Sequence, residues 1–271
     1  MIEKGQVTVD GAPVLEAGRD VVSAAQVRWD ANRPARSRAR SSLPLLYRDD
    51  ALVIVDKPAG LLAVPSSPDA RDEDTALLRV REFARHLHAQ RPYVGLVHRI
   101  DRDTSGALAF ALSPEARSRL RSLFRAHQIE RRYLALVHGV PREDRGTVDA
   151  AIHEEYAGGR RRLARGREPA LPALTRWTVV ERFAAAALLE VELKTGRQHQ
   201  IRLHLAHLGH PLVGERVYAG GRTAGSARRL SAPRQMLHAR LLSFVHPLTG
   251  APVRAESPLP ADFRRVLAAL R

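Results

Sequence analysis

Short apolar runs separated by polar turns occupy most of the chain after residue 43. Some are unbroken, as in ALVIV and ALAFAL, which is typical of strands buried on both faces. Another alternates, with Leu189, Val191 and Leu193 set between glutamates. These patterns predict strands at residues 51–55, 93–97, 107–112, 131–139, 175–183 and 187–194.

Apolar residues recur at helical spacing in four other segments. The strongest is 113–128, where Ser113 is placed as an N-cap and Pro114 stands at the first helical position. Three further helices are expected, and Gly209 is a natural stop for the one that starts at about Arg197. They cover residues 75–90, 197–209 and 260–271.

The beginning of the chain has a different pattern from the rest. Residues 1–30 indicate a helix end followed by short strands, because GQVTVDG alternates and then turns at Asp10-Gly11. Residues 31–42, ANRPARSRARSS, have no periodicity and predict a flexible basic linker. A compact domain is expected over 43–271.

Strands and helices are mixed within 43–271 without strict alternation, and several strands are consecutive. This order favours an α+β fold with a central, largely antiparallel mixed sheet flanked by helices. Composition agrees with a folded chain, because 44% of the residues are hydrophobic.

The net charge says more about function than the hydrophobic content does. The 44 lysines and arginines outnumber 29 acidic residues, for a formal net charge of +15. Such an excess predicts a polyanionic partner, most simply RNA or DNA. The chain has no cysteine, which excludes disulfides and thiolate metal sites and agrees with a cytoplasmic protein. No run of eighteen apolar residues and no export leader is visible, so we expect no membrane contact.

The segment HRIDRDTSG, residues 98–106, places six charged or hydroxyl residues between two predicted strands. A turn needs one or two polar residues, so this segment is either a crowded turn or an active site. A carboxylate such as Asp101, beside guanidinium groups, stays ionised and suits a nucleophile or an electrostatic stabiliser.

A second polar concentration is LKTGRQHQIRLH, residues 193–204. The predicted strand ends, Thr195-Gly196 turns the chain, and a helix is expected to start at about Arg197. Free N–H groups at that start, together with Arg197, would form a phosphate site. Ile201, Leu205 and Leu208 are expected to face the core. Arg202, one residue off that stripe, would point toward a neighbouring turn.

Tyr133 and the histidines complete the candidates. Tyr133 begins a strand after two arginines, where it could stack on a base or simply fill a half-buried position. Four histidines cluster between residues 199 and 210, but no HExxH motif and no nearby acid accompanies them. We therefore expect no metal site.

Taken together, the motifs resemble a known family. HRIDRDTSG is similar to the HRLDxxTSG signature of RluA-family RNA pseudouridine synthases. The resemblance extends in order to VDKPAGLLAVP, RRYLALVHG, TGRQHQIRLHLAHLGHPLVG, LHARLLSFVHP and SPLPADF, and so covers roughly residues 43–271. It implies the pseudouridine synthase fold, and an enzyme that isomerises uridine in structured RNA to pseudouridine with no cofactor and no metal.

The resemblance also implies roles for particular residues. Asp101 corresponds to the family's catalytic aspartate, Tyr133 to its active-site tyrosine and Arg202 to the arginine that pairs with the aspartate. Arg99 corresponds to the arginine that contacts RNA and helps displace the target base. We also expect RNA contacts from other residues of these motifs, namely Arg102, Arg131, Arg197, His199 and Gln200.

Several alternatives stay open at this point. The chain could be an RNA-binding protein that has lost turnover, or a metal-dependent nuclease using Asp101, Asp103 and histidines. Attack of Asp101 on the sugar and removal of the 2′ proton are both possible. Ribosomal and transfer RNA are both candidate substrates, and we expect a monomer. Residues 1–30 resemble the second half of the small RNA-binding domain that often precedes this catalytic domain, either truncated or kept as a remnant.

Overall fold

The computed structural model describes residues 7–10, 12–14, 24–30, 42–70, 73–87, 92–156, 158, 160–219, 230 and 232–271. The chain divides into two compact units, Met1–Ser42 and Leu43–Arg271. Apart from Ser42, the expected linker at 31–42 lies outside the described residues, and so does the expected helix end before residue 7.

The first unit contains a small antiparallel sheet in the order β2-β1-β3. Its strands are Val7–Val9, Ala12–Val14 and Val27–Trp29. The turn predicted after the first strand is confirmed, because Asp10 has a left-handed backbone with φ of 51°, which aspartate tolerates better than most residues.

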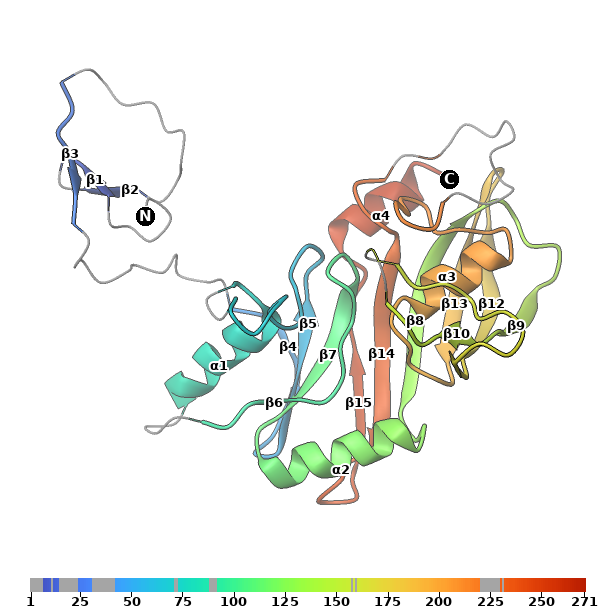
Figure 1. Ribbon diagram of the computed structural model, residues 1–271, viewed down its shortest axis with the longest axis horizontal. Coiled ribbons are helices and arrows are strands. Elements are labelled where there is room, and N and C mark those ends of the chain that lie inside the picture. Colours follow the sequence, from blue (N-terminus) through green and yellow to red (C-terminus); the bar gives the residue numbers. More distant parts are fainter. Residues whose placement is uncertain are drawn as a thin grey trace. The chain divides into compact units, whose positions relative to one another are not determined.

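The described residues of the second unit form one mixed sheet of ten strands (Figure 1). The main path is β4-β5-β7-β14-β8-β13-β12-β9, while β6 pairs with β7 and β15 with β14. Only β7 and β14 pair in parallel among these described strands. The strands are β4 Leu45–Arg48, β5 Leu52–Lys57, β6 Gly95–Leu96, β7 Ser105–Ala111, β8 Glu130–His138, β9 Arg145–Asp149, β12 Leu174–Arg182, β13 Ala186–Leu193, β14 Leu237–Val245 and β15 Pro252–Glu256.

In the described part of the chain, four helices and a small hairpin accompany the sheet (Figure 1). The helices are α1 Ala76–Leu87, α2 Pro114–Arg125, α3 Gln200–His207 and α4 Ala261–Ala268, and the hairpin pairs β10 Ile152–His153 with β11 Ala170–Leu171. Ser113 caps α2 as predicted, since its side chain accepts a hydrogen bond from the backbone N–H of Ala116. No helix of the described residues is long and apolar enough to cross a membrane.

The helices cover both faces of the sheet. One buried cluster joins α1 and α3 to one face of β5, β7, β8 and β13. On the other face, α2 packs against β5, β7, β14 and β15, and α4 packs against β8 and β13. Every residue of β7 is buried, which explains its unbroken apolar sequence. The α+β fold with a largely antiparallel sheet is therefore confirmed.

The structure corrects several expected elements. Strand 93–97 is reduced to Gly95–Leu96, and helix 197–209 begins only at Gln200. Strand β14, which lies between β7 and β8, was not predicted. Its pairing with β8 shifts register between Ala239 and Leu241, and this irregularity breaks the alternation that marks a strand.

Candidate active site

The charged segment 98–106 is a loop held from two sides by buried cations. The ammonium of Lys57 donates to the carbonyls of Pro58, Leu61 and Arg102, at 2.8, 2.7 and 2.9 Å. From the other side, Arg234 donates to the carbonyl of Asp103 at 3.0 Å and to the hydroxyl of Ser105 at 3.1 Å. The loop therefore has a fixed backbone, unlike a solvated charged turn.

Gly106 fixes the point where this loop enters the sheet. Its φ of +114° is unfavourable for other residues, and a Cβ there would lie 2.2 Å from the carbonyl oxygen of Ala239. Ser105 and Gly106 pair with His238 and Ala239 of β14, which also pairs Ala239 with Tyr133 of β8. Strand β14 thus brings the loop and Tyr133 to the same part of the sheet.

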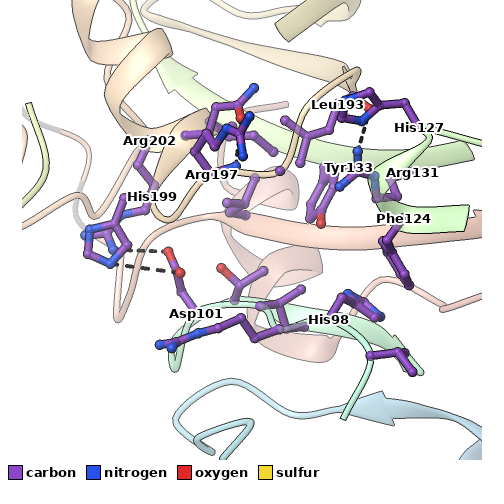
Figure 2. Close-up of a pocket in the computed structure, with 18 of the residues that line it drawn as sticks. His98, Asp101, Phe124, His127, Arg131, Tyr133, Leu193, Arg197, His199 and Arg202 are labelled. Atoms are coloured by element: carbon purple, nitrogen blue, oxygen red, sulfur yellow. Dashed lines mark hydrogen bonds and ion pairs between the residues drawn. The ribbon is translucent and has the colours of Figure 1, made fainter. Parts of the chain in front are cut away.

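Asp101 projects from the loop toward α3, where Arg202 meets it (Figure 2). The Nη1 of Arg202 lies 3.2 Å from Oδ2 of Asp101, while its Nε and Nη2 bind both oxygens of Glu215 at 2.9 and 2.8 Å. Burial opposes the charge on Arg202, but the hydrogen bonds and charges of Glu215 and Asp101 outweigh it and raise its pKa. The guanidinium is therefore held as a permanent cation that faces Asp101.

His199 approaches the other oxygen of Asp101. Its Nε2 lies 3.9 Å from Oδ1, and its Nδ1 is 2.8 Å from the hydroxyl of Tyr218. His199 has a left-handed backbone with φ of 59°, an unusual conformation that sites often retain. Burial lowers the pKa of His199, which favours the neutral ring at neutral pH.

Tyr133 lies at the start of β8 with 7% of its surface exposed. Its ring faces the same space as Asp101 (Figure 2). Burial raises the pKa of its phenol, the positive charge of Arg131 lowers it, and Asp101 raises it further. The phenol is therefore protonated at neutral pH.

These groups line one pocket of about 550 Å³, a size suited to a small-molecule ligand or a single nucleotide. Among the described residues that line it, Asp101 is the one acidic group, against six arginines: Arg99, Arg121, Arg125, Arg131, Arg197 and Arg202. Arg99 is exposed at the pocket, whereas Arg131 is buried. The pocket combines a single carboxylate with a strongly cationic wall.

Some predicted site residues are placed differently from what the sequence suggests. Gln200 is buried and its side chain is used inside the chain, because it accepts from the N–H of Arg197 at 2.9 Å and donates to Thr175 at 3.0 Å. This hydrogen bond occupies an N–H group of the expected phosphate site. Arg102 does not line the pocket, since its Nε donates to Gly60 at 3.0 Å. Leu208, expected in the core, is 38% exposed.

Two residues around the carboxylate were not found from the sequence. Glu215 follows α3 and has no exposed side-chain surface, while Tyr218 lies 5.3 Å from the guanidinium of Arg202. No sequence pattern marks either residue, because Glu215 and Tyr218 become neighbours of Arg202 only after folding.

The histidine cluster does not form a metal site in the described part of the chain. There, no three histidine, aspartate or glutamate side chains are grouped so that they could bind an ion. His204, for example, is buried with its Nε2 at 2.9 Å from the carbonyl of Ala150.

Comparison with known proteins points to one enzyme family. Residues 51–207 match the family model described as RNA pseudouridylate synthase. The whole chain aligns with 85% of the ribosomal large subunit pseudouridine synthase D of Pseudomonas aeruginosa at 38% identity. The protein of the same name from Xanthomonas campestris is 39% identical, over 84% of this chain and 70% of its own length.

A solved structure shows the same fold. The human RNA pseudouridylate synthase domain containing 4 superposes with a TM-score of 0.67 at 25% identity, over 84% of this chain and 92% of its own. The family model, which matches residues 51–207, includes the loop of Asp101, strand β8 with Tyr133 and helix α3 with Arg202. From the family match, the identity and the shared fold, we conclude that the chain belongs to the RluA family of RNA pseudouridine synthases, which are isomerases.

Proposed function

We propose that this enzyme isomerises uridine in ribosomal RNA and that Asp101 is its catalytic residue. The observation that carries the proposal is the pairing of Asp101 with the permanently charged Arg202 inside a cationic pocket. The ribosomal substrate is supported by the names of the relatives from Pseudomonas and Xanthomonas, which refer to the ribosomal large subunit. Transfer RNA has no comparable support.

The reaction breaks the bond between C1′ of ribose and N1 of uracil, turns the ring and rejoins C1′ to C5. A stacked base cannot turn, so the target uridine must leave the helix and enter the pocket. Arg202 orients the carboxylate of Asp101, ready either to bond C1′ or to take the 2′ proton and later return it. In both routes the C5 proton leaves, N1 gains a proton, and the product has the atoms of the substrate.

Tyr133 is assigned to the base. Its ring offers a surface for stacking the uracil, and its neutral hydroxyl faces the space where the ring must turn (Figure 2). Because burial raises its pKa, the phenol is a better relay for the C5 proton than a direct base.

RNA contacts are assigned by exposure. Arg99 is exposed at the pocket and Arg197 lines it, which suits both for phosphates beside the displaced uridine. Exposed Arg102 would reach more distant phosphates, and His199 would contact the ribose near Asp101. Gln200 supports the turn before α3 and is not assigned to RNA. We expect no cofactor, because the proposed isomerisation consumes no external oxidant, reductant or group donor.

The test uses large-subunit ribosomal RNA transcribed without modification, incubated with the purified protein in the presence of chelator. Pseudouridine is mapped by carbodiimide labelling and primer extension. We expect a discrete new site with the wild type and none with Asp101→Asn.

A site made only in transfer RNA would refute the ribosomal assignment. Activity that chelator abolishes would favour metal-dependent chemistry. Salt-sensitive binding to all RNAs without any new site would favour a protein that only binds RNA.

A further inference from the structure

Arg131 is buried in the pocket wall with few partners. It is 7% exposed, and its Nη2 donates to the carbonyl of Leu193 at 3.2 Å. Its Nε is buried without a hydrogen-bond partner, and the ring of Phe124 lies 5.8 Å from the guanidinium. Much of the donor capacity of this cation is therefore unused.

The other buried arginines show how unusual this is. In the described part of the chain, Arg131, Arg202 and Arg234 are the buried arginines. Arg202 is paired with Glu215 and Arg234 with Asp262, whereas no described carboxylate lies within ion-pair distance of Arg131. A buried unpaired charge is costly, and burial lowers the pKa of Arg131.

The chain also leaves room for this cation. Gly196 has an ordinary backbone conformation, yet a Cβ at that position would lie 2.5 Å from Nη1 of Arg131. A side chain at Gly196, where the backbone φ is not positive, would therefore displace the guanidinium of Arg131 from this position.

Arg131 occupies the end of the pocket away from Asp101. It shares a face of β8 with Tyr133, and the charges of both Arg131 and Asp101 act on the Tyr133 phenol. Figure 2 shows Tyr133 between the two. A uridine with its ribose at Asp101 and its base on Tyr133 would direct the far edge of the ring toward Arg131.

We propose that Arg131 is a further catalytic residue, which contacts the carbonyl edge of the uracil and holds the negative charge of the base once it has left the ribose. This rests on the proposed function of the site. When the C1′–N1 bond breaks, its electron pair leaves with the ring and spreads over N1, O2 and O4. The guanidinium stays protonated throughout and gives up no proton. When C5 bonds to C1′, the pair returns and the charge on the ring is lost.

A backbone phosphate is the competing ligand for such a cation. Depth argues against it, because phosphates contact exposed side chains, and Arg99 already offers one at this pocket. A donor that is fixed in a dry site and aimed at developing charge is worth far more to the transition state than to binding.

The first test compares Arg131→Met and Arg131→Lys with the wild type, and uses Arg99→Met as a matched control at the exposed side of the pocket. Single-turnover rates at saturating enzyme and the Kd for ribosomal RNA at several salt concentrations are measured. For Arg131→Met we expect a rate loss of about 100-fold or more with the Kd within about threefold. Arg131→Lys, which keeps the charge, should recover part of the rate. Arg99→Met should instead weaken binding and reduce the salt dependence.

Normal single-turnover rates for Arg131→Met with weaker, less salt-dependent binding would make Arg131 a phosphate contact and overturn the proposal. Thermal unfolding gives a second readout. Removal of a buried unpaired charge should raise the Tm of Arg131→Met by a few degrees. A lower Tm would show that Arg131 supports the fold and would contradict the proposal.

The second test changes the leaving group. Fluorine at C5 of the target uracil stabilises the departing anion, so less help from Arg131 is needed. With 5-fluorouridine RNA, the ratio of wild-type to Arg131→Met rates for the rearranged nucleoside, separated by liquid chromatography, should shrink severalfold. An unchanged ratio would overturn the proposal. Wild-type turnover in the same series reports separately on the proposed function.

Discussion

At the scale of single residues, the buried cations of the site differ in the groups that neutralise or solvate their charge. Arg202 has two carboxylates, so its charge is stable and it can orient Asp101. Lys57 is compensated differently, by three carbonyl groups from its own turn and from the loop that carries Asp101. Burial lowers the pKa of Lys57 from its ordinary 10.5 to about 7. Lys57 therefore supports the catalytic loop, but burying its charge lowers the free energy of unfolding by an amount that depends on pH.

We predict that Lys57 makes the protein more stable as pH rises. Between pH 7 and 10.5 the unfolded chain holds a proton on Lys57 that the folded chain has released, so the free energy of unfolding increases through this window. Urea unfolding at pH 7 and 9.5 should show a gain about 2–3 kcal/mol larger in the wild type than in Lys57→Met. Equal gains in the two proteins would mean that Lys57 keeps an ordinary pKa.

Residue types alone found part of this site. Asp101 stood out in a charged segment between two predicted strands, and Arg202 stood out beside the apolar stripe of a predicted helix. The structure brings them together. Glu215 and Tyr218 did not stand out, because their partners lie on α3 and become neighbours only after folding. Lys57 was not singled out either, since its burial cannot be read from the sequence VDKPAG.

At the scale of elements, β14 connects the two parts of the site. It pairs in parallel with β7 and antiparallel with β8, and thereby sets the distance between the loop of Asp101 and Tyr133. Strands and helices with regular periodicity, such as β7, β13 and α2, were predicted close to their observed bounds. The predicted start of α3 at about Arg197 was wrong, and the helix begins at Gln200. The side chain of Gln200 accepts a hydrogen bond from the N–H of Arg197 and keeps residues 197–199 in a turn.

We predict that Gly106→Ala disrupts the contact between β7 and β14. The new methyl group would meet the carbonyl of Ala239 and also carry the cost of a positive φ. We expect a loss of unfolding free energy of about 3 kcal/mol or more, together with loss of activity. Gly250→Ala is the control, because its φ of +75° is also positive but no atom lies within 4 Å of its Cβ position. It should cost about 1 kcal/mol, and equal losses in urea unfolding would refute the steric argument.

At the scale of the whole molecule, the excess of arginine sets how RNA is bound. A net charge of +15 attracts any polyanion, and the pocket concentrates six arginines around one carboxylate. Charge of this kind provides affinity without sequence information. The choice of uridine must therefore come from shape and from contacts to the base in the pocket.

We predict that the affinity for RNA falls steeply with salt concentration, and that Arg99 contributes to this dependence whereas Arg264 does not. Arg99 is exposed at the pocket, whereas Arg264 is exposed on α4, which packs against the opposite face of the sheet. Arg99→Ala should lower the slope of log Kd against log salt by about one, and Arg264→Ala should leave it unchanged. Filter binding at salt concentrations between about 50 and 300 mM measures these slopes. Equal effects of the two changes would mean that RNA does not approach the pocket.

The central claim is that Asp101 performs the isomerisation, and the most direct measurement is release of the C5 proton. Ribosomal RNA labelled with tritium at C5 of uridine is mixed with excess enzyme, and tritium in the solvent is counted for the wild type and Asp101→Asn, with Kd measured in parallel. Asp101→Asn removes one charge and keeps the shape of the side chain. We expect release by the wild type and none above background by Asp101→Asn. The Kd values should agree within about threefold, because RNA affinity is assigned to the arginines around the pocket, which this change leaves in place. Release by Asp101→Asn at the wild-type rate would contradict the account and assign the chemistry to another residue.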